Sequence, residues 1–339
     1  MTGCADEPAE PPCRDDAPLG RASPSPGRLV RPVPVDPTGA QGPTRGQAAG
    51  PRWRRTSHGL IVPSQTSTDL VEQRILEQSM RLPAYGAVTG WAALRLVGAG
   101  LVDGLAPDGR SPLPVPLIVG PHGRLRPTPG ALPVHCALPA TERAVRHGVP
   151  CVVAERAAYD ATWLAEDLRE AVVAVDMAMA AGLVTLPQMW AYADSRRPRS
   201  GWVERALSLA SPRSRSPQET RLRLIWHLDA KLPLPLVNAS VRDLAGHLLG
   251  IVDLLDVEAC LAVEFDGADH REARRHTDDV TREDDLRDVG LEVAHVTGLQ
   301  LHDRTQAAAR LEAARRRAPF TPREERLWVV DSQGRLPNA

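Results

Sequence analysis

The feature that most constrains the fold is a series of short apolar segments between residues 216 and 317. Ser216 is followed at once by proline and three residues later by glutamate, which is a start signal for a helix expected over Pro217–Leu228. The expected elements after this helix are three strands, a helix, a strand and a helix, at Leu236–Leu244, Leu248–Leu255, Ala259–Phe265, Thr277–Val289, Leu291–Thr297 and Asp303–Arg317. Short turns join the first three strands, so we expect antiparallel hairpins. The order predicts an α/β (α+β) domain with a mixed sheet flanked by helices.

The rest of the chain divides by composition. The first 50 residues hold 10 prolines and 7 glycines with few large apolar side chains, which predicts a disordered arm that cannot offset the entropy of ordering. Apolar residues then recur at helical spacing, most clearly over Ala158–Gly182, and a short β-type segment lies at Val115–Val119. The expected parts are therefore the arm, a mainly helical α+β domain, the α/β domain and a C-terminal tail, at residues 1–50, 51–211, 212–318 and 319–339.

Composition argues against several classes of protein. The chain carries 41 basic and 42 acidic residues, so as a whole it lacks the charge of a general nucleic-acid binder. Its five cysteines form no CxxC pair, which indicates free thiols in a reducing compartment rather than a zinc site or a disulfide framework. The longest apolar region, Ala171–Leu186, contains Asp176 and is shorter than the ~18–20 residues of a membrane span. The N-terminal residues lack the apolar stretch of a signal peptide, and we expect a soluble, cytoplasmic protein without membrane association.

Carboxylates interrupt two of the expected strands. Asp253 lies within one apolar segment, and Glu264 and Asp266 lie in the next, where strand alternation places both on the same face. A hairpin turning at Asp256–Glu258 would bring Asp253 beside Glu264. Carboxylates that are brought together in apolar strands are costly to bury unless a cation or a shared proton offsets their charge. A Mg²⁺ ion, which prefers hard oxygen ligands, would suit such a group.

Other polar residues could join these carboxylates. His270 follows Asp266 closely and could act as general base or orient water, or could simply be solvated. Glu219 could add a fourth carboxylate, or act only in the capping of its helix. Arg271 and Arg282 could face phosphates, or pair with the strand carboxylates at a solvent-exposed rim of the sheet. Arg282 could also pair with acidic residues of its own helix.

The spacing of these residues resembles a known family, the very-short-patch-repair-like endonuclease-fold domain, which is a branch of the PD-(D/E)xK nuclease superfamily. The matching pieces are Asp253, then Val263-Glu264-Phe265-Asp266-Gly267 with His270, then Asp279-x-x-Arg282 and Gly290-Leu291-Glu292-Val293. The resemblance covers roughly residues 216–317. It implies a restriction-endonuclease-like core that acts on DNA, in which Asp253 and Glu264 would hold a metal ion. In this sequence we expect Mg²⁺ as that ion, with Asp266 as a further ligand and His270 as an assisting catalytic residue.

A second similarity lies upstream. Three segments, Trp53–Leu60, Gly90–Leu94 and Arg156–Asp160, resemble the actinobacterial abortive-infection type IV antitoxin-like proteins, which carry such a nuclease-like domain at the C-terminal end. The winged helix-turn-helix of that family would precede Trp53, where this sequence has its Pro/Gly-rich arm. We therefore expect no DNA-reading helix there.

Two departures from the nuclease pattern leave two functional hypotheses open. Asp266 stands where the superfamily usually has a lysine that positions the attacking water, and Lys231, the single lysine of the chain, lies before the first expected strand. Residues 216–317 hold 14 basic and 19 acidic residues, which disfavours phosphate binding by that domain. The first hypothesis is a Mg²⁺-dependent DNA endonuclease of defence or repair type. The second is a catalytically inactive nuclease-fold module that regulates transcription or binds a protein partner.

Overall fold

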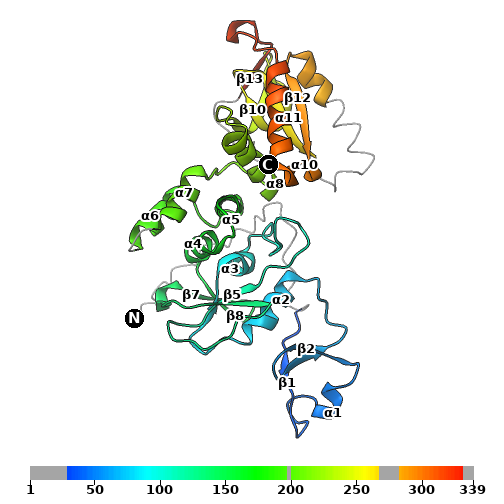
Figure 1. Cartoon of the computed structure of the whole chain (residues 1–339), viewed down its shortest axis with the longest axis vertical. Helices are drawn as coiled ribbons and strands as arrows, with labels where there is room; N and C mark the ends of the chain where they lie inside the picture. The colour runs from blue at the N-terminus through cyan, green and yellow to red at the C-terminus, as the bar shows by residue number, and fades with distance from the viewer. Residues whose placement is uncertain (1–28, 197–199, 267–281, 331–339) are drawn as a thin grey trace, which may run out of the picture.

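The computed structural model describes residues 29–196, 200–266 and 282–330. It has two lobes, with a small separate sheet beside the first lobe, and Figure 1 shows them one above the other. The expected α/β class is confirmed in both lobes, each of which is built around a five-stranded mixed sheet.

The small sheet contains β1 (Val33–Pro34), β2 (Trp53–Ser57) and β3 (Leu60–Pro63), in the antiparallel order β1-β3-β2, with the short helix α1 (Arg45–Ala48) between β1 and β2. The structure therefore shortens the expected disordered arm. Residues 29–50 are held by pairing with a distant strand and by Gln73, whose side chain donates to the carbonyl of Val30 and accepts from its N–H, both at 2.8 Å. Residues 1–28 of the arm lie outside the described residues.

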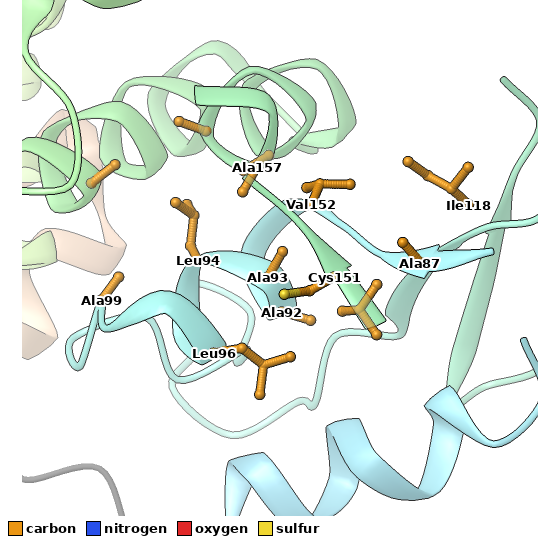
Figure 2. Close-up of a cluster of buried hydrophobic side chains, with 14 of the residues drawn as sticks. Ala87, Ala92, Ala93, Leu94, Leu96, Ala99, Ile118, Cys151, Val152 and Ala157 are labelled. Atoms are coloured by element: carbon orange, nitrogen blue, oxygen red, sulfur yellow. The ribbon is translucent and has the colours of Figure 1, made fainter. Parts of the chain in front are cut away.

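The first lobe confirms the expected mainly helical α+β domain. Its sheet has the order β6-β5-β4-β8-β7, with strands β4 to β8 at Ala87–Val88, Val115–Ile118, Ala131–Val134, Arg143–Arg146 and Val149–Val152. Its helices α2 to α7 are Val71–Ser79, Gly90–Val97, Ala154–Leu164, Leu168–Ala180, Leu186–Ser195 and Gly201–Leu209. Small and branched side chains fill its core, as the close-up of Leu94, Cys151 and Val152 in Figure 2 shows. This packing fits a chain with only 4% aromatic residues.

The helix expected over Ala158–Gly182 is in fact two helices. The α4 helix ends at Leu164, Ala165 is extended, and Asp167 caps α5 by accepting hydrogen bonds from the N–H groups of Arg169 and Glu170, both at 2.9 Å. Aspartate is a favoured N-cap residue, so Asp167 starts a new helix here. The spacing of apolar residues does not report on capping, and it therefore did not reveal the break.

The second lobe follows the expected order of elements. It begins with α8 (Pro217–Leu224), which continues as a π-helix over Ile225–Asp229. Strands β9 to β12 are Leu236–Asp243, Leu248–Asp256, Leu261–Asp266 and Glu292–Thr297, and the last helices are α10 (Gly298–His302) and α11 (Arg304–Arg317). Residues 282–288 form the described part of the helix expected before β12. The hairpins β9-β10 and β10-β11 are antiparallel as expected, and β11 pairs with β12 in parallel.

The sheet of this lobe has the order β12-β11-β10-β9-β13 and is covered on two sides. Trp226 and Leu311 pack with Leu254 and Val263, while Leu286 packs in a second cluster with strand residues such as Ala262. The edge strand β13 (Trp328–Val330) pairs antiparallel with β9. The lobe therefore extends beyond residue 318 into the segment that the sequence assigned to a tail, because the exposed edge of β9 offers backbone partners to that segment.

The lobes meet where α5 packs against α8. Asp176, which interrupts the long apolar region of the sequence, is fully buried at this contact. It accepts hydrogen bonds from Ser211 N at 2.7 Å, from Thr220 Oγ1 at 2.9 Å and from Arg223 Nη2 at 2.8 Å. The expected domain boundary near Ser211 thus coincides with a buried polar network that joins the two lobes.

Two further expectations concern the membrane and the cysteines. Among the described residues, no helix combines the length and the apolar character needed to cross a membrane. Three of the five cysteines, Cys136, Cys151 and Cys260, lie in the described part of the chain and are free thiols.

Candidate functional site

The β10-β11 hairpin brings two strand carboxylates together. Leu254 lies opposite Val263 in the antiparallel register, so Asp253 and Glu264 follow side by side on the same face of the hairpin. Asp253 Oδ2 accepts a hydrogen bond from the N–H of Phe265 at 2.7 Å. The hairpin that turns at Asp256–Glu258 therefore places Asp253 beside Glu264, as the sequence predicted.

Asp253 is an unusual carboxyl group. Its pKa is raised to about 7, chiefly by burial and also by repulsion from Glu219 and Glu264, against the lowering effects of the Phe265 N–H and the Arg282 guanidinium. A carboxyl group with such a pKa is partly protonated near neutral pH. This is the property expected of a metal ligand or a proton-transfer group.

Glu264 has one satisfied and one unsatisfied oxygen. Burial raises the pKa of Glu264, while Arg282 and His295 oppose that shift. Its Oε2 pairs with the guanidinium of Arg282, whereas its Oε1 is buried without a hydrogen-bond partner among the described residues. Buried carboxylate oxygens without a partner are rare in native proteins, because leaving such a group unsatisfied is costly.

Among the described residues, the partners of Arg282 lie on the strands of the sheet. It reaches across to Glu264 and also donates to the carbonyl of Ile251 at 3.3 Å. This is the expected pairing with a strand carboxylate, but it does not lie at a solvent-exposed rim, because only 14% of the Glu264 side chain is exposed.

Glu219 lies on α8 and contributes to the same electrostatic environment. Ser216 Oγ accepts from the N–H of Glu219 at 3.2 Å, which confirms one half of the expected capping box. The Glu219 carboxylate does not complete that box. It accepts instead from Arg215 N at 2.9 Å and from Asn238 Nδ2 at 2.6 Å, and it is close enough to raise the pKa of Asp253.

Asp266, which the sequence predicted as a metal ligand, lies next to His295. Its Oδ1 lies 3.1 Å from His295 Nδ1, and the other ring nitrogen of His295 lies 3.1 Å from Glu283 Oε1. Burial lowers the pKa of His295, but the hydrogen bonds and attraction of Asp266 and Glu283 outweigh that effect and raise it overall. The sequence analysis did not single out His295, although its place in the strand that pairs in parallel with Glu264 was a usable signal.

Two expected site residues, His270 and Arg271, lie outside the described residues. Within the described ranges, no three histidine, cysteine, aspartate or glutamate side chains are arranged to hold a metal ion. The residues that the structure does bring together are Asp253, Glu264 and Glu219, with Arg282 pairing with Glu264. Carboxylate is the ligand type that a hard cation such as Mg²⁺ prefers, so these side chains have the chemistry of such a site but not a three-ligand arrangement.

Comparisons with known proteins assign no family to the chain. No protein-family model matches it, and no curated protein or solved structure matches it either. The function is therefore argued from the geometry of this site.

Proposed function

We propose that the C-terminal lobe binds a Mg²⁺-type ion through Asp253 and Glu264 and hydrolyses DNA phosphodiesters. The observation that carries this proposal is the buried Oε1 of Glu264, which has no partner among the described residues and lies beside Asp253, whose pKa is raised to about 7. A folded protein tolerates such a group where a ligand completes it, because an unsatisfied buried charge is costly. The mixed sheet and its flanking helices support the same proposal through the resemblance to a nuclease core.

Each side chain has a separate role in this proposal. Asp253 and Glu264 would hold the ion, Glu219 would add negative charge behind Asp253, and the ion would lower the pKa of a bound water and stabilise a phosphoryl transition state. His295 favours the ionised form of Glu264, which is one of the effects that a superfamily lysine would have. The sequence-based role of His270 in orienting water stays part of the proposal.

A second candidate is a catalytically inactive module that regulates transcription or binds a protein partner. The ion pair between Arg282 and Glu264 favours it, because a guanidinium already offsets the charge that a metal would neutralise. Asp266 in the usual lysine position favours it as well, since its carboxylate lies near His295 instead of joining Asp253 and Glu264. This candidate predicts a folded lobe whose thermal stability does not depend on divalent ions.

A cleavage assay separates the two candidates. Supercoiled, linear and mismatched DNA are incubated with the full chain and Mg²⁺ or Mn²⁺, and the same is done with Glu264→Gln and Asp253→Asn. The first candidate predicts metal-dependent cleavage that falls to background in both variants. The matched control is Glu312→Gln, an exposed α11 residue paired with Arg316, which should cleave like the wild type.

The outcome that contradicts the nuclease proposal is cleavage unchanged by Glu264→Gln. Absence of cleavage by the wild type with every DNA and both ions, together with an unfolding temperature that divalent ions leave unchanged, supports the inactive module.

A further inference from the structure

Two cavities lie next to each other at the junction of the lobes, away from the carboxylates of the C-terminal sheet. The larger has a volume of about 420 Å³ and is walled by the loop of residues 101–113, by α4 and α5, and by the first turn of α8. The smaller has about 210 Å³ and lies between the start of α5, α8 and the start of α11. Glu170, Gln218 and Arg221 line both, so the cavities are neighbours. The larger volume is within the ~300–1,000 Å³ typical of small-molecule sites.

The larger cavity, which we call the chamber, is apolar. Its side chains include Trp91, Leu105, Leu113, Leu164, Val173 and Met177. Of these, Val173 and Met177 are buried and the other four are partly buried. Apolar walls of this kind favour a hydrocarbon or aromatic group over water.

Its loop wall is held in place by specific contacts. Arg74 Nη2 donates to the carbonyl of Gly104 at 2.8 Å, and its guanidinium lies over the ring of Trp91 at 5.0 Å. Trp91 Nε1 in turn donates to the carbonyl of Pro114 at 2.9 Å. Gly104 has a φ of +66° and lies so close to Trp91 that a β-carbon there would contact the ring at 2.2 Å. The chamber is therefore preformed rather than a gap between loosely packed segments.

The smaller cavity, which we call the vestibule, has arginines in its lining. Arg169 Nη2 donates to both oxygens of Asp229, at 2.8 and 2.7 Å, and its Nη1 is closed off from solvent with no hydrogen-bond partner among the described residues. The exposed side chain of Arg304 forms no hydrogen bond or ion pair with any described residue. In contrast, Arg221 is committed to Glu170 by two hydrogen bonds at 2.8 and 2.7 Å. The vestibule is thus lined by arginines from both lobes, and Arg304 is the one whose guanidinium is exposed and has no partner among the described residues.

We propose that this junction binds a small amphipathic molecule, with its apolar body in the chamber and its anionic end, a carboxylate or a phosphate, at the exposed guanidinium of Arg304. A guanidinium forms charge-assisted hydrogen bonds with either anion. Such a ligand touches α5 of the first lobe and α8 and α11 of the second, so it bridges both lobes. The site shares no residue with the carboxylate site and stands or falls independently of the nuclease proposal.

Calorimetric titration of the full chain tests the proposal with three ten-carbon probes: decanoate, decyl phosphate and the uncharged decanol. We expect one binding site per chain for decanoate or decyl phosphate, and the tighter of the two identifies the source of the anion. Decanol should bind at least tenfold more weakly. Absence of binding by both anionic probes, or decanol binding as tightly as they do, overturns the proposal.

Variants locate the site. Two chamber variants should each lower the affinity at least tenfold: Ala174→Phe, which fills the chamber from α5, and Leu105→Asp, which places a charge in its loop wall. The control is Ala180→Phe, which lies farther along α5 and outside the lining and should not lower the affinity. Arg304→Gln should weaken the anionic probes several-fold and leave decanol unchanged, with Arg316→Gln, on the same helix, as its control. Wild-type affinity in both chamber variants would overturn the proposal. Leu105→Asp lies in a loop, so it still tests the proposal if Ala174→Phe fails to fold.

Discussion

Asp176 and Glu264 are both carboxylates that interrupt apolar segments, and the structure treats them differently. Burial raises the pKa of each. Asp176 receives three donors, from Ser211, Thr220 and Arg223, so both of its oxygens are used. Glu264 pairs with one guanidinium, and its other oxygen is buried without a partner among the described residues. The satisfied carboxylate acts as a joint between the lobes, and the unsatisfied one is the position where a ligand is expected.

The comparison also explains why a charge is tolerated at each place. The Asp176 network ties α5 to α8 through donors supplied by both, so its cost of desolvation is offset inside the protein. Asp253 and Glu264 lie on strands whose neighbours supply fewer donors, and their mutual repulsion adds to the cost. A cation would offset that cost.

The largest expected effect follows from breaking the satisfied pair. Asp176→Asn leaves Arg223, which is 7% exposed, without its carboxylate, and removing one partner of a buried pair costs about 3–5 kcal/mol. Urea unfolding of the full chain measures this loss. The exposed Glu312→Gln serves as control and should change the free energy of unfolding by less than about 0.5 kcal/mol. If Asp176→Asn lowered the free energy of unfolding by less than about 1 kcal/mol, the Asp176 network would not be what holds the two lobes together.

The second expected effect is a pH-dependent change in the free energy of unfolding when Asp253 is replaced. The folded-state pKa of Asp253, about 7, lies above its ordinary value of 3.8, so the folded chain holds this proton more tightly than the unfolded chain does. Its contribution to stability is therefore fully present below pH ~4 and is lost as the pH rises through ~7. We expect Asp253→Asn to gain stability relative to the wild type between pH 5 and pH 8, by about 3 kcal/mol at most.

Urea unfolding in the presence of a chelator, at both pH values, checks this expectation. Taking the difference between the unfolding free energies of Asp253→Asn and the wild type removes the contribution of all other titrating groups. A difference that does not change with pH would mean that Asp253 is ionised in the folded chain across this range.

The smallest expected effect concerns Arg282, which pairs with Glu264 in place of a metal. Arg282→Ala frees the carboxylate, and we expect Mn²⁺ to bind about threefold to tenfold more tightly, in line with the ~1 kcal/mol of a partly exposed ion pair. Arg287→Ala is the matched control, since Arg287 lies in the same helix and pairs with Glu283. Weaker binding in Arg282→Ala would show that Arg282 orients Glu264 for the ion.

The second lobe was more predictable from the sequence than the start of the first. Alternating apolar residues, the Ser216 cap and short turns are local signals, and they predicted strands such as Leu248–Asp256 to within a few residues. Residues 29–50 have a composition typical of disorder, but Gln73 and β3, both distant in sequence, hold them. Propensity cannot anticipate a contact that the rest of the fold supplies.

The site was predicted in part, for a similar reason. Strand alternation and the hairpin turn were enough to place Asp253 beside Glu264. The sequence could not show that Asp266 lies next to His295, or that Arg282 reaches Glu264, because these contacts depend on how β12 and the helix before it pack on the sheet.

The most direct test of the central claim, that Glu264 and Asp253 await a cation, is calorimetric titration of the metal-free chain with Mn²⁺. We expect one bound ion per chain. Binding should be lost in Glu264→Gln and retained in Asp176→Asn, which needs only to be folded at the temperature of the titration. Equal Mn²⁺ binding by Glu264→Gln and the wild type, or no binding by the wild type, would contradict it.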